Sequence, residues 1–169
     1  MPDTELNSTA AALLGLLHER AMTGGELVAA ADARFGPFWS MTRSQVYREL
    51  PKLAAAGYVR LGKPGPRAAQ PYSITSAGKR AFARWLGERP GTDHPRNPLL
   101  LRASFGAQQS AGQRAALLQE GRSQHEQRLG ALREQLKDKG LDPYVRATLD
   151  FSVSYERALL KWIDAAEKA

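Results

Sequence analysis

The sequence predicts a mainly α-helical protein with one small β-hairpin, organised as two structural units. Apolar residues recur at steps of three or four over most of the 169 residues, whereas strand-like alternation is confined to residues 58–75. Three prolines and a glycine fall within residues 90–98, a composition typical of a linker. We therefore expect one unit over residues 1–90 and a second over residues 98–169.

The first two helices are expected before residue 37. The first follows Ser8 or Thr9 as its cap and runs to about residue 20. The second follows Thr23, whose hydroxyl can accept from the amide of Glu26 while the glutamate reaches back, the reciprocal pairing of a capping box. It should end near Gly36, which permits a left-handed residue.

A third helix is expected after Thr42, which repeats the capping-box pattern with Gln45, and it should close at Gly57. Pro51 lies inside it, where proline removes a backbone donor and crowds the preceding turn, so we expect a kink. Trp39, between the second and third helices, is expected in the core, because large aromatic side chains usually are.

A hairpin and a fourth helix complete the first unit. Residues 58–61 and 71–75 alternate like strands, and the residues between them are dense in glycine, proline and basic side chains. Thr75 can cap the fourth helix, which should end near residue 90. Helices separated by a tight turn and followed by a basic hairpin form a winged helix-turn-helix, in which the third helix enters the major groove of DNA.

The second unit is expected to be helical throughout. We expect a short helix over residues 99–105, a long one over residues 111–139, and a last one whose cap and first residue are Asp142 and Pro143. Two antiparallel amphipathic helices with exposed apolar stripes bury themselves poorly alone, which favours dimerisation with an identical chain. The expected dimer interface consists of Leu118, Leu129, Leu132, Leu136, Tyr144 and Leu159.

Basic residues are concentrated in the first unit. The formal net charge is +7, but residues 34–84 hold ten basic residues and a single acid, Glu49, so this stretch carries +9 and the rest of the chain −2. A surface this uneven attracts a polyanion, because each neutralised phosphate releases condensed counterions. By charge alone the candidates are DNA, RNA and an anionic membrane.

Several classes of function have no support in the sequence. Cysteine is absent, no apolar run is long enough to cross a bilayer, and the N-terminus lacks the features of a secretion signal, so a cytoplasmic location is expected. The three histidines are far apart, and no cluster of titratable residues suits catalysis. We expect no enzyme activity, metal site or cofactor.

The first half contains an ordered set of short motifs: Gly24-Gly25-Glu26-Leu27, Phe38-Trp39, Thr42, Val46-Tyr47 and the segment 72–78. This ordered set resembles the PadR family of bacterial transcriptional regulators. In that family, the phenylalanine-tryptophan, the following serine or threonine and the aliphatic-tyrosine pair mark the recognition helix.

The sequence departs from the family pattern at two places, and the resemblance continues more weakly into the second half of the chain. Gly25 stands where an aromatic residue is common, and Ala68-Ala69-Gln70 replaces the usual basic pair of the wing. The second half resembles, by pattern and length, the PadR subgroup with an extended C-terminal helical dimerisation domain.

The residues expected to bind DNA lie on the third helix and the hairpin. Arg43 can fork onto guanine, and Gln45 can pair with adenine. Lysine and arginine on the hairpin suit sequence-neutral phosphate contacts. The full expected set is Thr42, Arg43, Ser44, Gln45, Tyr47, Arg48, Lys52, Lys63 and Arg67, with Thr23 and Gly24 as further phosphate contacts at a helix N-terminus.

These observations predict a homodimeric repressor that binds a pseudo-palindromic operator in double-stranded DNA. The resemblance implies that a small aromatic or amphipathic effector modulates DNA affinity. Trp85, Phe151, Tyr155 and Trp162 either line an effector pocket or form interface core, and their spacing leaves both open. Two alternatives are a winged-helix regulator resembling the MarR group and a protein-interaction module without specific DNA binding.

Overall fold

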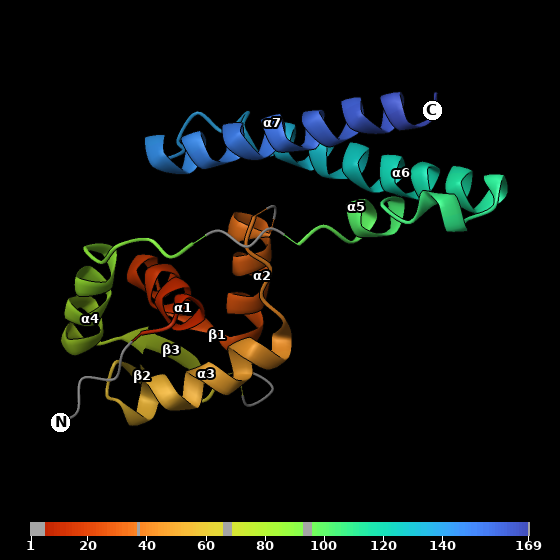
Figure 1. The fold of residues 1–169 in the computed structure, drawn as a ribbon. Helices are drawn as coiled ribbons and strands as arrows, with labels where there is room; N and C mark the ends of the chain where they lie inside the picture. The colour runs from red at the N-terminus through yellow and green to blue at the C-terminus, as the bar shows by residue number, and fades with distance from the viewer. Residues whose placement is uncertain (1–5, 37, 66–68, 93–95, 169) are drawn as a thin grey trace. The chain divides into compact units, whose positions relative to one another are not determined.

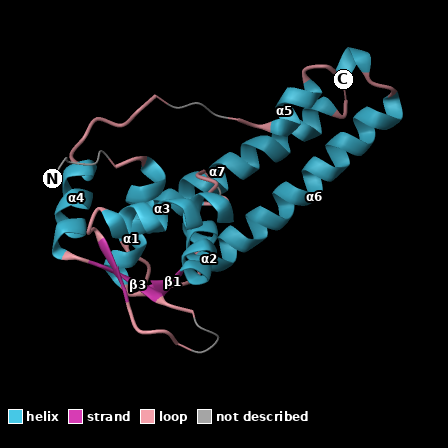
Figure 2. Ribbon diagram, turned by 90° about the horizontal axis from the view of Figure 1, so that it is seen from below, coloured by secondary structure: helices cyan, strands magenta, loops and turns pink. Residues whose placement is uncertain are grey.

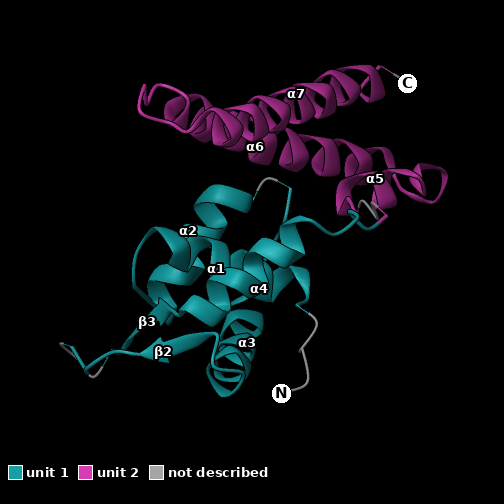
Figure 3. Cartoon of the chain, turned by 90° about the vertical axis from the view of Figure 1, so that its left-hand side faces the viewer, with its two compact units in different colours: residues 1–91 teal, residues 92–169 magenta. Residues whose placement is uncertain are grey.

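The computed structural model describes residues 6–36, 38–65, 69–92 and 96–168 (Figure 1). The chain divides into two compact units, residues 1–91 and 92–169, shown in different colours in Figure 3. Within the described ranges, helices predominate and the strands form one small sheet, which confirms the predicted fold class.

Unit 1 contains α1 (Ser8–Glu19), α2 (Gly24–Phe35), α3 (Arg43–Ala55) and α4 (Ser76–Leu86). The cap predicted for α1 was wrong, because Asn7 precedes the helix and its Oδ1 accepts from the amide of Ala10 at 2.9 Å. Asparagine caps a helix at least as well as serine, so Ser8 becomes the first helical residue.

The capping boxes predicted for α2 and α3 are both present. Thr23 pairs with Glu26, and Thr42 pairs with Gln45, through reciprocal bonds between side chain and backbone. The left-handed conformation expected at Gly36 was wrong: its φ of −43° and ψ of −38° are right-handed helical. Its amide donates to the carbonyl of Asp32, so the helical hydrogen bonding continues through this residue.

The sheet of unit 1 has three antiparallel strands in the order β1-β3-β2 (Figure 1), and Figure 2 shows β1 beside β3. β2 (Val59–Leu61) and β3 (Pro71–Ile74) form the expected hairpin. β1 (Met22–Thr23) adds to the free edge of β3, with Met22 opposite Tyr72. Sequence patterning missed β1, because two residues are too few to show alternation.

The core of unit 1 is built around α1. Leu13 and Leu14 of α1 are fully buried, and Leu27, Val46 and Leu50 reach them from α2 and α3. Helix α3 therefore turns its apolar face to the core, and Arg43, Ser44 and Arg48 stay exposed.

The junction between α3, the hairpin and α4 is tightly joined. Gly57 ends the α3 segment with a φ of +72°, a conformation that favours glycine. The hydroxyl of Thr75, the predicted cap of α4, donates to the carbonyl of Gly57 at 2.7 Å. A Cβ at Gly78 would collide with the backbone oxygen of Tyr58. The hairpin is therefore held in a defined place beside α3.

The expectations for Trp39 and Pro51 have different outcomes. Trp39 is 43% exposed, so its predicted place in the core was wrong. It lies in the connection between α2 and α3, while leucines fill the interior. Helix α3 continues through Pro51, whose side chain is exposed, and the predicted kink stays a prediction.

Unit 2 contains α5 (Pro98–Ala103), a 3-10 turn η2 (Gly106–Gln108), α6 (Ala111–Gln135) and α7 (Pro143–Ala166). Asp142 caps α7, as predicted. Helix α6 ends before the predicted residue 139, because the guanidinium of Arg146 binds the carbonyls of Leu136 and Asp138 at 3.2 and 2.7 Å. Those carbonyls lie just beyond the helix end and are satisfied by a side chain of α7.

Helices α6 and α7 run antiparallel and bury a stripe of each against the other. The leucines 118, 129, 132 and 159, predicted to contact a partner chain, are buried within the unit, and Leu136 is half-buried there. Helix α7 also buries Leu149 and Val153 against the leucines of α6, and sequence patterning missed these two residues. Of the residues predicted on α7, Leu159 is buried, whereas Tyr144 is 83% and Phe151 62% exposed.

A buried polar pair also joins the two helices. The Nδ1 of His125 lies 2.5 Å from the Oε2 of Glu156, and both side chains are almost fully buried. At the C-terminal end of α7, Arg122 of α6 binds Asp164 and Glu167 at 2.7 and 2.9 Å. These contacts hold α6 and α7 in register where the aliphatic stripe is interrupted.

Candidate nucleic-acid interface

Helix α3 has one apolar face and one polar face. Val46, Leu50 and Leu53 are buried against the core. The opposite face carries Arg43, Ser44, Tyr47 and Arg48, all exposed. An amphipathic helix whose polar face meets solvent can enter a groove without loss of its own packing.

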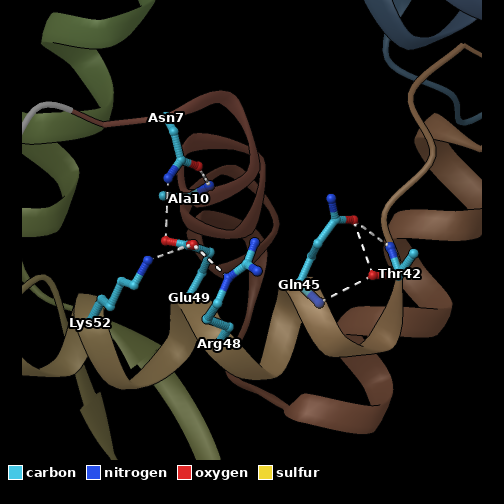
Figure 4. A network of polar contacts seen from close by, with 7 residues as sticks. All are labelled: Asn7, Ala10, Thr42, Gln45, Arg48, Glu49 and Lys52. Carbon is cyan, nitrogen blue, oxygen red and sulfur yellow. Dashed lines mark hydrogen bonds and ion pairs between the residues drawn. The ribbon is translucent and has the colours of Figure 1, made fainter.

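The start of α3 is ordered by Thr42 and Gln45 (Figure 4). The amide of Thr42 donates to Gln45 Oε1 at 2.8 Å, its hydroxyl donates to the same oxygen at 3.2 Å, and the amide of Gln45 donates to the Thr42 hydroxyl. A bidentate contact with adenine needs both the oxygen and the nitrogen of glutamine. Because the oxygen already accepts twice, only the nitrogen of Gln45 can serve a base while the cap is intact.

Arg43 lies over the ring of Tyr47 one turn further along α3. Its guanidinium carbon is 5.6 Å from the centroid of the ring, a cation–π distance. Both side chains are exposed, and neither belongs to the core. This contact limits the directions in which the Arg43 side chain extends from the helix.

Glu49 organises the positive charge further along α3. Its side chain is only 6% exposed, and it binds Lys52 Nζ at 3.0 Å, Asn7 Nδ2 at 3.3 Å and Arg48 Nε at 3.7 Å (Figure 4). Burial disfavours the charged carboxylate, but the hydrogen bonds from Lys52 and Asn7 and the two positive charges outweigh it and lower the pKa of Glu49.

Glu49 was not among the residues predicted for the site. Its signal in the sequence was its isolation as the single acid within residues 34–84. Because its carboxylate offsets part of the charge of Lys52 and Arg48, these two residues attract phosphate less than free cations would.

At the start of α2, where a phosphate contact was predicted, a carboxylate of the chain itself already binds Thr23. The carboxylate of Glu26 accepts from the amide of Thr23 at 2.8 Å and from its hydroxyl at 2.9 Å, and Arg20 binds the carboxylate at 3.1 Å. The hydrogen bond from the Thr23 amide is the main reason that the pKa of Glu26 falls to about 2. A phosphate at Thr23 and Gly24 would have to compete with this carboxylate.

Lys63 lies on the hairpin just beyond the end of β2. Lys63 is exposed and follows Gly62, whose amide donates to the carbonyl of Pro71 at 2.7 Å and so closes the strand pair. Arg67, the other basic residue predicted here, lies outside the described residues.

The four aromatic residues predicted for a pocket or interface divide between the units. Trp85 of α4 belongs to unit 1 and stacks on Phe82, with ring centroids 6.3 Å apart. The other three lie on α7: Phe151 is exposed, Trp162 is half-buried, and the Tyr155 hydroxyl accepts from Asn97 at 3.2 Å.

In the described part of the chain, no group of three or more His, Cys, Asp or Glu side chains is arranged to hold a metal ion. None of the described helices is long and apolar enough to span a membrane.

Both units match known protein families. Residues 13–84 match the transcriptional regulator PadR-like family, and residues 95–169 match the virulence activator alpha C-terminal family. The negative transcriptional regulator PadR of Bacillus subtilis is 31% identical over 98 residues, which cover 56% of this chain and 54% of that protein. A probable transcriptional regulator of Mycobacterium tuberculosis is 34% identical over 91 residues, covering 47% of each chain. The chain thus spans about half the length of these curated relatives.

Solved structures share the fold over nearly the whole chain. Bacillus subtilis PadR in complex with operator DNA covers 96% of this chain and 98% of its own, with a TM-score of 0.76 and 22% identity. The same protein in complex with p-coumaric acid covers 94% of this chain and 95% of its own, with a TM-score of 0.68 and 22% identity. The virulence activator AphA of Vibrio cholerae covers 95% of this chain and 96% of its own, with a TM-score of 0.66 and 26% identity. The winged-helix unit, over residues 13–84, is thus similar to the PadR-like family of transcriptional regulators.

Proposed function

We propose that this chain is a homodimeric transcriptional repressor that binds double-stranded DNA through α3 and the hairpin, and whose DNA affinity responds to a small aromatic effector. The observation that carries the proposal is the polar and basic face of α3, which is exposed while the opposite face is buried. Such a regulator acts on the chromosome, so we place it in the bacterial cytoplasm.

We assign the roles at the site from the chemistry of the side chains. Arg43 is the base reader, because a guanidinium forks onto the O6 and N7 of guanine. Thr42, Ser44, Tyr47 and Arg48 contact bases or phosphates along the same face, and Gln45 donates a single hydrogen bond. Lys52, Lys63 and Arg67 anchor the DNA backbone with no sequence preference.

Self-association has support in the outer face of α7. Tyr144, Phe151 and Tyr155 are 83, 62 and 37% exposed, although each is large and largely apolar. Large apolar side chains gathered on one face mark a surface that another molecule covers. A two-fold dimer would carry two copies of α3, which suits a pseudo-palindromic operator.

The known relatives support the sign of regulation and the kind of effector. The Bacillus subtilis relative is a negative regulator, and its fold has been solved with operator DNA and with p-coumaric acid. By analogy, we assign repression to this chain and a small aromatic compound as its effector. Such a compound acts only if it binds the DNA-competent and incompetent states with different affinity.

The test is fluorescence-anisotropy binding to the DNA upstream of the protein's own coding region, compared with a scrambled duplex. We expect preference for the native duplex and an effect of Arg43→Ala of about 1–3 kcal/mol on that preference, the usual value of one bidentate base contact. Lys63→Ala should weaken binding to both duplexes alike, because a phosphate contact carries no sequence information.

A salt titration separates this proposal from a protein-interaction module. Phosphate binding weakens linearly when the logarithm of affinity is plotted against the logarithm of salt concentration. Equal, weak and salt-insensitive binding to both duplexes would contradict the proposal.

A further inference from the structure

The first residue of α2 lies directly against the side chain of Tyr47. A Cβ at Gly24 would lie 2.9 Å from Cζ of the Tyr47 ring, 3.0 Å from Cε1 and 3.1 Å from the hydroxyl oxygen. Contacts this short are not tolerated, so any residue other than glycine displaces the ring. A Cβ at the adjacent Gly25 would meet no atom within 4 Å.

The same ring carries the guanidinium of Arg43. Arg43 and Tyr47 are four residues apart on α3, a spacing that places them on one face, and the guanidinium carbon is 5.6 Å from the ring centroid. A free arginine side chain samples many rotamers, and ordering them on binding costs free energy. The ring restricts this sampling before DNA arrives.

We propose that Gly24 and Tyr47 position Arg43, so that the base preference of α3 depends on a glycine in α2. The proposal rests on the proposed role of Arg43 as a base reader. Gly24 provides the space for the ring, and the ring provides the surface for the guanidinium. Tyr47 is a positioning residue in this respect, in addition to any contact of its own with DNA.

A purely structural role fits the contacts less well. Tyr47 is 48% exposed, so its ring fills no part of the core and can swing aside when a Cβ appears at Gly24. Gly24→Ala should therefore stay folded. It also keeps the backbone amide of residue 24, so any phosphate contact there is unchanged.

The test compares Gly24→Ala with Gly25→Ala, which lie in the same first turn of α2 and gain the same methyl group. Two duplexes serve as probes. The first is enriched by the wild-type protein from a random-sequence pool. The second is the same duplex changed at the base pair for which Arg43→Ala loses its preference. The measurement is the ratio of the two dissociation constants for each variant. We expect Gly24→Ala to reduce this ratio about two- to fivefold, the value of an exposed cation–π contact, and Gly25→Ala to leave it unchanged.

Two further measurements separate positioning from other effects. In an Arg43→Ala background, adding Gly24→Ala should cause no further loss of preference, because the residue being positioned is gone. Tyr47→Leu should reduce the ratio at least as much as Gly24→Ala does, because it removes the ring on which the guanidinium lies.

The results distinguish the inference from the function on which it rests. If the wild-type protein enriches no duplex, the proposed function fails and the inference fails with it. If it enriches one but Gly24→Ala matches Gly25→Ala, or costs as much without Arg43 as with it, only the positioning role is overturned. A loss of preference confined to Gly24→Ala and Tyr47→Leu, and absent without Arg43, would establish it.

Discussion

Glu49 shows how a single side chain sets the charge of the proposed DNA-binding face. It is the one acid within residues 34–84, and its buried side chain on α3 binds Lys52, Arg48 and Asn7. Its lowered pKa means that the folded state favours the charged carboxylate more than the unfolded state does. The stability gained in this way is present above the unfolded pKa and is lost as the pH falls through the lower, folded value.

We expect Glu49→Gln to reduce the free energy of unfolding by about 1–3 kcal/mol near neutral pH, the range for a hydrogen bond to a charged group. Denaturant unfolding at neutral pH and below about pH 4 measures this, and the gap between wild type and variant should narrow in acid. Glu134→Gln, which removes an exposed pair with Lys137, serves as the control and should cost little. A gap that is constant with pH would contradict the role assigned to the carboxylate.

At the scale of elements, α5 depends on a glycine of α6. A Cβ at Gly121 would lie 2.7 Å from Cδ2 of Leu99, so the absence of a side chain lets α5 approach α6. Helix α5 has only six residues and cannot be stable without this contact. Its place in unit 2 is therefore a property of packing rather than of its own sequence.

Gly121→Ala and Gly130→Ala test this dependence within one helix. A Cβ at Gly130 would meet no atom within 4 Å, so that change should raise the stability of unit 2 by up to about 1 kcal/mol through helix propensity. Gly121→Ala should gain less or lose stability, and it should speed hydrogen exchange of the α5 amides. Unchanged exchange in α5 would show that Leu99 adjusts freely.

At the scale of the whole molecule, the outer face of α7 exposes large apolar side chains among the described residues. Tyr144 and Phe151 are its most exposed large apolar side chains. The pairing of α6 with α7 buries the opposite stripe, so the exposed one is available to a second chain. Dimerisation through this face would bring two winged-helix units to one operator.

We expect Phe151→Glu to weaken self-association at least tenfold, about 1.4 kcal/mol, because a charge would replace an apolar contact. Arg157 is also exposed but is not one of the aromatic residues of the outer face of α7. Arg157→Glu should therefore weaken self-association less. Sedimentation over a range of protein concentrations measures both. A wild-type protein that is monomeric at every concentration would refute the dimer.

The sequence by itself determined the features that depend on neighbouring residues: the capping boxes at Thr23 and Thr42, the hairpin, and Asp142 before α7. Capping, turn chemistry and periodicity are local, and short motifs in order were enough to indicate the family. Tertiary structure decided which apolar stripe of α7 is buried, that Trp39 lies outside the core, and that Gly24 meets Tyr47. These depend on which surfaces meet across long separations in the chain, and residue type alone does not determine the partner that each side chain finds.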